Sequence, residues 1–441
     1  MKSWSNMSAA DLGRDIERGR INPVELTEHF LDAIAHHPLS PRIYARTTEA
    51  RARAEALGAA GRAKAGLRRG PLDGVPLSWK DLYDTAGVAT EAGSALLQGR
   101  IPATDAAVLR TATLQGAICL GKTHMTELAF SGLGLNPVTA SPPCVNDDRA
   151  VSGGSSSGAA ISVALGLAPA ALGSDTGGSV RIPAAWNDLV GLKTSHGRLS
   201  LEGVVPLRPR FDTLGPLARV VEDCALILAL LEGRKSDPTP LPLTGLRLAV
   251  LETLVLEDLA EAPAKGFDDA LTRLARAGAT ITRVKALEVT EAVTLAGLLF
   301  AAEAYGTWSS VIEAAPDKMF ARVLTRFRSG AGFKAADYVA GWQRLDALRR
   351  SFALTASGFD AVLLPTSPIL PPDAARLMAE PDYFDAMNLR ALRNTRIGNL
   401  MDQCVLTLPT SQPSCGISLM CPSGHDDRLL RIGLAAEAAL V

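Results

Sequence analysis

The segment Gly173–Pro183 reads GSDTGGSVRIP and holds three glycines and three hydroxyl side chains. Glycine adopts backbone conformations that other residues avoid, and it lets another molecule approach the main chain closely. Proline, which ends the segment, suits the first turn of a helix. The segment therefore predicts a loop that ends where a helix begins.

Stretches typical of strands and helices alternate on both sides of this loop. Residues 75–80 alternate between apolar and other side chains, and residues 8–34 carry apolar side chains at helical spacing on either side of Asn22-Pro23. We expect further helices at 105–115 and 157–165, and strands at 117–120, 167–172, 246–251 and 361–365. The alternation predicts an α/β fold with a mainly parallel or mixed sheet.

The proline-rich segment Gly233–Gly245 is the one candidate for a linker between two domains. The strands expected after it would nevertheless return readily to the same sheet as the earlier ones. We therefore expect a single domain over residues 1–441, with residues 233–245 as a surface connection.

Composition and charge exclude several classes of protein. The 45 Lys and Arg residues nearly balance 46 Asp and Glu, so no overall field would draw the chain to nucleic acid or to an anionic membrane. The amino terminus has no apolar signal segment, and the most apolar run, Ile161–Leu172, is too short to span a bilayer. The six cysteines form no CxxC pair and the six histidines no HExxH motif. We expect a cytoplasmic protein without a metal site or a disulfide framework.

A second glycine-rich loop, VSGGSSSG at Val151–Gly158, leads into an apolar helix. Such a loop can hold phosphate on its backbone amides. The Gly-Lys-Ser/Thr ending of a phosphate-binding loop is missing, however, and no GxGxxG follows the preceding strand. Phosphate binding is therefore disfavoured, and so is a plain flexible linker, because the loop runs straight into the helix.

Lys80 is a lysine in an otherwise apolar or small-residue strand. A lysine held near the core loses hydration, which lowers its pKa and can leave the amine neutral and basic. The alternative from this segment alone is a lysine on an edge strand that reaches solvent.

Ser179 stands where the loop of Gly173–Pro183 becomes a helix. The neighbouring N–H groups can turn toward one point and form an oxyanion hole, in which each donor stabilises a tetrahedral intermediate by about 3 kcal/mol. A serine nucleophile needs a base, which is usually histidine. Here Lys80 would have to serve, through a second hydroxyl.

Together the three segments resemble the amidase signature family, whose members use a Ser-cisSer-Lys triad. GVPLSWKDLYDTAG matches the lysine motif, GGSSSGAA the cis-serine motif and GSDTGGSVRIPAAW the nucleophile motif. Ser155 follows Lys80 by 75 residues and Ser179 follows Ser155 by 24, as in the family. Weaker similarity covers nearly the whole chain. The resemblance implies an α/β/α sandwich around a mixed sheet, with the catalytic core at about residues 70–220.

Carried over by position, the resemblance implies that Ser179 is the nucleophile, Ser155 the bridging acid and base, and Lys80 the final base. The oxyanion would be bound by backbone N–H groups, those of Thr176, Gly177, Gly178 and Ser179.

Three further residues would support this triad. Gly154 would precede Ser155 through a cis peptide bond, and Ser156 would help to hold Lys80. Arg181 would form an ion pair or hydrogen bonds rather than take part in catalysis.

The resemblance implies hydrolysis of a small-molecule carboxamide to a carboxylate and ammonia or an amine, with no cofactor and no metal. One alternative is the glutaminase-type A subunit of a glutamyl-tRNA amidotransferase, which works with partner subunits. Others are a hydrolase of urea-like amides, such as biuret derivatives, and a catalytically silent binding protein. A homodimer is left open as the assembly.

The residues that select the substrate are expected in the variable segments 125–145 and 301–333. The candidates are Met125, Phe130, Gly132, Tyr305 and Arg326. A compact polar site that uses Arg326 or Arg328 for a small urea-like substrate stays open beside a mixed apolar pocket.

Overall fold

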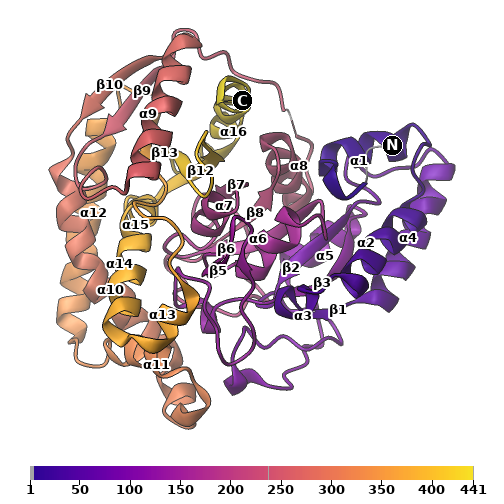
Figure 1. Ribbon diagram of the computed structural model, residues 1–441, viewed down its shortest axis with the longest axis horizontal. Helices are drawn as coiled ribbons and strands as arrows, with labels where there is room; N and C mark the ends of the chain where they lie inside the picture. Colours follow the sequence, from indigo (N-terminus) through magenta and orange to yellow (C-terminus); the bar gives the residue numbers. More distant parts are fainter. Residues whose placement is uncertain (1–3, 237, 441) are drawn as a thin grey trace.

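A computed structural model describes residues 4–236 and 238–440, which form a single α/β domain around one mixed sheet (Figure 1). Eleven strands pair in the order β1-β3-β2-β6-β8-β7-β12-β13-β11-β9-β10, and β4 and β5 form a separate hairpin. The pairs β2–β3, β2–β6, β9–β10 and β9–β11 are parallel and the others antiparallel. The strands are β1 (Tyr44–Thr47), β2 (Pro76–Lys80), β3 (Ile118–Thr123), β4 (Pro143–Cys144), β5 (Asp147–Val151), β6 (Ala170–Asp175), β7 (Val190–Lys193), β8 (Thr213–Ala218), β9 (Arg247–Leu251), β10 (Thr280–Val284), β11 (Ala361–Pro365), β12 (Gln403–Pro409) and β13 (Gly416–Pro422). The predicted α/β class and mixed sheet are confirmed.

Helices cover the sheet and extend beyond its ends. They are α1 (Ala9–Glu17), α2 (Pro23–His36), α3 (Ser40–Ile43), α4 (Glu49–Lys64), α5 (Ala107–Leu114), α6 (Ser157–Ala164), α7 (Arg181–Trp186), α8 (Val221–Glu232), α9 (Glu261–Arg276), α10 (Leu287–Ile312), α11 (Ala321–Arg328), α12 (Ala335–Ala356), α13 (Ala374–Ala379), α14 (Pro381–Arg393), α15 (Thr395–Leu400) and α16 (Asp426–Leu440). Four 3-10 turns complete the set, η1 (Trp4–Asn6), η2 (Ala95–Leu97), η3 (Glu127–Ala129) and η4 (Pro316–Lys318).

The two largest hydrophobic clusters include residues from opposite faces of the sheet, because successive strand residues point to opposite faces. In β12, Leu406 packs in one core and its neighbour Val405 in the other. A Cβ on Gly433 of α16 would meet the Leu406 side chain, and one on Gly398 of α15 would meet Val405. Helices α15 and α16 therefore lie on opposite faces of the sheet, as a three-layer sandwich requires.

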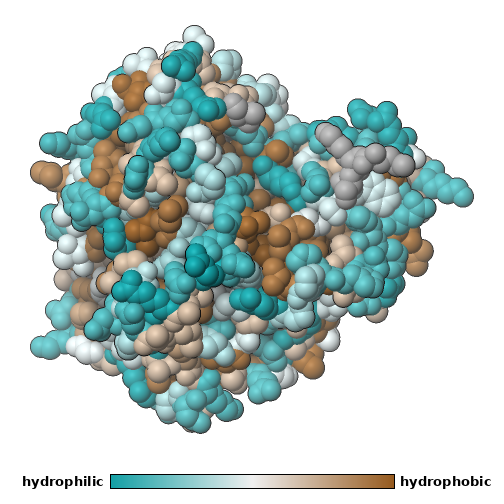
Figure 2. Space-filling view, viewed as in Figure 1, coloured by the Kyte–Doolittle hydropathy of each residue, from teal (hydrophilic) through white to brown (hydrophobic). Residues whose placement is uncertain are grey.

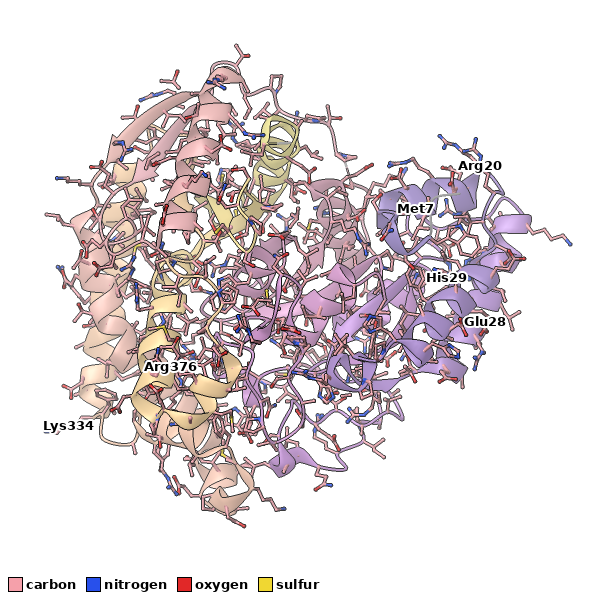
Figure 3. The ribbon with its side chains drawn as sticks, viewed as in Figure 1. Met7, Arg20, Glu28, His29, Lys334 and Arg376 are labelled. Carbon is pink, nitrogen blue, oxygen red and sulfur yellow. The ribbon has the colours of Figure 1, made fainter. Side chains whose placement is uncertain are left out.

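The two amphipathic helices predicted at the amino terminus are α1 and α2. Ser8 caps α1 by accepting a hydrogen bond from the Asp11 N–H, and Asn22 caps α2 just before Pro23. The buried Asp223 carboxylate of α8 accepts the N–H groups of the first two residues of α1, which ties that helix to the body of the domain. Glu28 of α2 and Arg20, from the turn between the two helices, lie at the periphery, as does Lys334 at the opposite edge (Figure 3).

The proline-rich segment 233–245 does not divide two sheets. The strand that follows it, β9, pairs with β10 and β11 in the same sheet as the strands before it. One position of this segment, residue 237, lies outside the described residues. The boundaries 70–220 of the catalytic core stay a prediction.

The surface carries polar residues between separate hydrophobic patches on the face drawn in Figure 2. Some large apolar side chains are exposed, Leu287 and Leu354 among them. Single exposed apolar side chains are common on folded proteins and need no binding partner to explain them. Across the described ranges, no helix is both long and apolar enough to cross a membrane. All six cysteines are buried and free.

Strands β2 and β6 bring the sequence motifs together. They are neighbours and parallel, so their carboxyl ends meet at the same edge of the sheet. Lys80 is the last residue of β2 and Asp175 the last of β6. The loop after β6 leads into α7, and the serine-rich loop leads into α6, which packs on both strands. The site is built where these four elements meet.

Candidate active site

Lys80 is fully buried, and its amine contacts three hydroxyl groups. Its Nζ lies 2.7 Å from Ser155 Oγ, 3.0 Å from Ser156 Oγ and 2.9 Å from the Oγ of Ser174. Burial lowers the pKa of Lys80 to about 7, although the charges of two aspartates at longer range act in the opposite direction. The alternative of an edge lysine that reaches solvent is wrong, because β2 lies between β3 and β6.

The surroundings of Lys80 differ from those of another buried lysine on the next strand. Lys122 forms an ion pair of 3.2 Å with Asp81. No carboxylate within the described chain is at ion-pairing distance from Lys80, whose hydrogen-bond partners are the three serines. A neutral amine suits such a cluster, because it can donate two hydrogen bonds and accept one.

The serine-rich loop is fixed through its backbone. The Gly154–Ser155 peptide bond is cis, as expected. The Gly154 N–H donates to the Gly132 carbonyl, and a Cβ on Gly154 would lie 2.6 Å from the Gly134 nitrogen, so no larger residue fits. The Ser156 N–H donates to the Ser179 carbonyl oxygen at 3.2 Å. The backbone thus holds the Ser155 segment directly beside Ser179.

The loop after β6 folds around the Asp175 carboxylate. The N–H groups of Gly178 and Val180 donate to its two oxygens, at 2.9 and 3.1 Å. This differs from the expected oxyanion hole, because the Gly178 N–H already has an acceptor. In the part of the chain that the structure describes, the N–H groups of Thr176, Gly177 and Ser179 have no acceptor.

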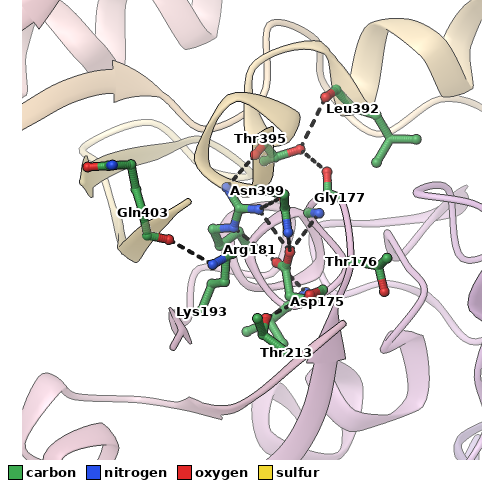
Figure 4. Close-up of polar contacts among 12 residues, drawn as sticks. Asp175, Thr176, Gly177, Arg181, Lys193, Thr213, Leu392, Thr395, Asn399 and Gln403 are labelled. Carbon is green, nitrogen blue, oxygen red and sulfur yellow. Dashed lines mark hydrogen bonds and ion pairs between the residues drawn. The ribbon is translucent and has the colours of Figure 1, made fainter. Parts of the chain in front are cut away.

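Arg181 is a buried ion-pairing residue, as its position in the motif implied (Figure 4). Its guanidinium donates to both oxygens of Asp175 and to the Asn399 side chain. Burial opposes ionisation of Asp175, but Arg181 outweighs it and holds the pKa of that carboxyl well below its usual range. The network joins the loop to α15, where the Thr395 hydroxyl also donates to the Gly177 carbonyl.

A small cavity of about 140 Å³ lies against this loop. Its lining includes Phe130 and Arg326, which are two of the five residues predicted to contact the substrate. A Cβ on Gly177 would lie 3.7 Å from Arg396 Cγ and 3.9 Å from Phe300 Cε2, and both of these residues line the same cavity. Two side chains of the cavity wall therefore pack beside Gly177, which carries one of the free amides and does not itself line the cavity.

The other three candidates do not line this cavity. Met125 is fully buried and its carbonyl accepts a hydrogen bond from Asn136. Gly132 sits behind the serine-rich loop, where a Cβ would meet Leu392. The Tyr305 hydroxyl is 3.5 Å from a Glu313 oxygen on the exposed side of α10. Their substrate-binding roles stay predictions without support from this geometry.

Sequence reasoning missed several residues of the site. Ser174 is one of the hydroxyls of the loop but has no role in the predicted triad, and Asp175 is the only acid there, in a position where a carboxylate commonly caps a turn. Both could have been found from these signals. Arg208 and Arg396 line the cavity from distant segments, and neither lies in one of the three motifs that carry the resemblance.

The chain resembles known proteins over nearly its whole length. It matches the amidase family over residues 25–430. A 2-amino-5-chloromuconic acid deaminase of Comamonas testosteroni is 36% identical, over 98% of this chain and 97% of that protein. The A subunit of the glutamyl-tRNA(Gln) amidotransferase of Acidothermus cellulolyticus is 31% identical, over 100% and 95%. A solved crystal structure of an amidase superposes with a TM-score of 0.88 at 30% identity, over 99% of this chain and 100% of that one.

Proposed function

Since this chain belongs to the amidase family, whose activity is hydrolysis of C–N amide bonds, we propose that it cleaves a small-molecule carboxamide through an acyl-enzyme on Ser179. Ser155 relays protons between Ser179 and Lys80. The observation that carries the proposal is the 2.7 Å contact between Lys80 Nζ and Ser155 Oγ, together with a lysine pKa of about 7. A base with a pKa near the working pH transfers protons efficiently in both directions.

In the acylation step, the Ser179 oxygen bonds to the carbonyl carbon of the substrate. Its proton passes to Ser155, while the Ser155 proton passes to the neutral Lys80 amine. The carbonyl oxygen becomes an oxyanion, which the free N–H groups of Thr176, Gly177 and Ser179 stabilise. The Gly178 N–H contributes instead through Asp175, by fixing the turn that aims these amides.

The tetrahedral intermediate collapses when the C–N bond breaks. Lys80 returns its proton to Ser155, which protonates the departing nitrogen, so ammonia or an amine leaves as a neutral molecule. Water then attacks the acyl-enzyme by the same relay, and the carboxylate product leaves with Ser179 restored.

The test is release of ammonia from a panel of aryl, aliphatic and urea-like primary amides. Ser179→Ala and Lys80→Ala should each lower kcat/KM by a factor on the order of 10³ or more. Ser157→Ala is the matched control, because its hydroxyl lies 3.4 Å from the His124 carbonyl and does not contact Lys80. Full amide hydrolysis by both triad variants would refute the assignment.

A glutaminase that works inside an amidotransferase complex is the second candidate, because one relative that aligns over the full chain is named as the A subunit of a glutamyl-tRNA(Gln) amidotransferase. Glutamine hydrolysis that appears only with co-purifying partner subunits would favour it. We further propose a cytoplasmic location, and a homodimer is the assembly to test by light scattering.

A further inference from the structure

Three arginines meet in the small cavity beside the oxyanion loop. Arg208 comes from the segment between β7 and β8, Arg326 from α11 and Arg396 from α15. Phe130 and Phe300 form apolar walls, and the rest of the lining is small or aliphatic apart from Ser329. The cavity lining contains no Asp or Glu.

These guanidinium groups lack the anionic partners that buried arginines usually have. Arg208 is 5% exposed, and its Nε and Nη1 are buried without a hydrogen-bond partner. The Nε of Arg396 is also buried and has no hydrogen-bond partner. The Arg326 side chain donates a hydrogen bond to the Phe130 carbonyl, at 3.0 Å. Among the described residues, none of the three forms an ion pair, whereas the buried Arg181 has Asp175.

The arrangement is electrostatically unfavourable on its own. Burial lowers the pKa of Arg208 and of Arg396 to about 9. The charge of Arg326 lowers both pKa values further. For Arg208, the carboxylates of Asp212 and Glu303 act on the pKa in the opposite direction. An anion would offset both the desolvation and the mutual repulsion. Like-charged groups are tolerated in such clusters where a ligand supplies the missing charge.

The two aromatic rings restrict how an anion can approach. The Arg208 guanidinium carbon lies 4.8 Å from the centroid of Phe130 and 4.3 Å from that of Phe300. Rings occupy space over the guanidinium, so the in-plane N–H groups stay as donors. A flat carboxylate matches such donors with two parallel hydrogen bonds.

From this geometry we propose that Arg208, Arg326 and Arg396 bind a free carboxylate on the substrate, so that the preferred substrate is a small amide of a dicarboxylic acid. The assignment rests on the proposed amidase function. Arg396 and Phe300 of the cavity wall pack beside Gly177, so the carboxylate would lie on the side of the oxyanion loop that these two side chains face.

The experiment compares primary amides that end in a carboxylate, from malonamate to adipamate, with neutral methyl-terminated amides of the same chain length. The wild-type enzyme should prefer the best carboxylated amide by about 100-fold in kcat/KM, because charged hydrogen bonds are made to that group alone. Arg208→Met and Arg396→Gln should each lose most of this preference, and circular dichroism with urea unfolding shows whether the variants fold.

Arg328→Gln is the matched control. Arg328 lies two residues from Arg326 on the same helix, but it pairs with Glu313 at the surface and does not line the cavity. This variant should keep the preference for carboxylated amides. A preference lost equally in Arg328→Gln would overturn the proposal.

A direct binding measurement tests the carboxylate site separately from the proposed amidase function. Adipate and inorganic phosphate are titrated calorimetrically into the wild-type protein and into Arg396→Gln. Adipate binding that weakens at least about tenfold in the variant supports the carboxylate site, even if no amide is hydrolysed and the proposed function fails. Hydrolysis with no advantage for carboxylated amides, or phosphate binding without adipate binding, overturns the inference and leaves the amidase function standing.

Discussion

Titration of Lys80 should control both activity and stability. If the neutral amine is the base, kcat/KM of the wild-type enzyme should fall on the acid side with a midpoint at about 7, the pKa that burial gives this lysine. About nine-tenths of the lysine is then neutral at pH 8 and about one-tenth at pH 6. We therefore expect about a tenfold loss of kcat/KM between these two pH values, measured with an uncharged amide so that the substrate does not titrate.

The same shift predicts how stability depends on pH. The folded-state pKa of Lys80, about 7, lies below the ordinary value of 10.5. Between these values the unfolded chain binds more protons than the folded one, so Lys80 makes the folded protein more stable as pH rises. From pH 7 to pH 9, the unfolding free energy of the wild type should therefore rise by about 2 kcal/mol relative to that of Lys80→Met.

Urea unfolding at the two pH values measures this difference, and other titrating groups cancel in the comparison. An acid limb with a midpoint near pH 4 to 5 would indicate a carboxylate as the critical base. That result, together with a stability difference that does not change with pH, would refute the account of Lys80.

Three other substitutions test the loop after β6, and a fourth tests the lysine's surroundings. Arg181→Met leaves its buried carboxylate partner unpaired and should cost about 3 to 5 kcal/mol of unfolding free energy by urea titration, and a cost below about 1 kcal/mol would contradict the ion-pair network. Gly178→Ala should lower stability by about 2 kcal/mol or more, because φ is +137° and the new Cβ would lie 2.2 Å from a threonine hydroxyl. Gly177→Ala, whose Cβ would make only ordinary contacts, should unfold within about 1 kcal/mol of the wild type, and equal losses in the two variants would contradict the loop geometry. Ser174→Ala removes one partner of Lys80 and should lower kcat/KM by roughly tenfold without abolishing it, so complete inactivation would give Ser174 a larger role than positioning.

The sequence was sufficient for the parts of the site that lie in contiguous motifs. Lys80, Ser155 and Ser179 lie in glycine-rich or alternating segments. The residue pattern of each segment predicts both its secondary structure and a candidate catalytic side chain. The strand β2 and the helices that begin after the two loops followed from local spacing. In the structure the carboxyl end of β2 meets the amino ends of the two helices. The single sheet also followed, since a strand was expected after the proline-rich segment.

The sequence could not predict what depends on distant contacts. The three arginines of the cavity lie in separate elements, and only folding brings them together without a carboxylate. Arg326 is a candidate because it lies in a variable segment, but the same reasoning selects Met125, which the fold buries in the core. Similarly, the four consecutive N–H groups are equivalent donors in the sequence, and only the folded loop shows that the Asp175 carboxylate accepts the one from Gly178.

The most direct test of the central claim is to trap the acyl-enzyme. A slowly turned-over aryl ester or amide is mixed with the enzyme, the reaction is quenched in acid during the steady state, and the digested protein is analysed by mass spectrometry. We predict one acyl group on the peptide that contains Ser179, and none in Ser179→Ala. An enzyme that turns over the substrate with the acyl group on another residue, or with no covalent adduct at any time, would contradict the account.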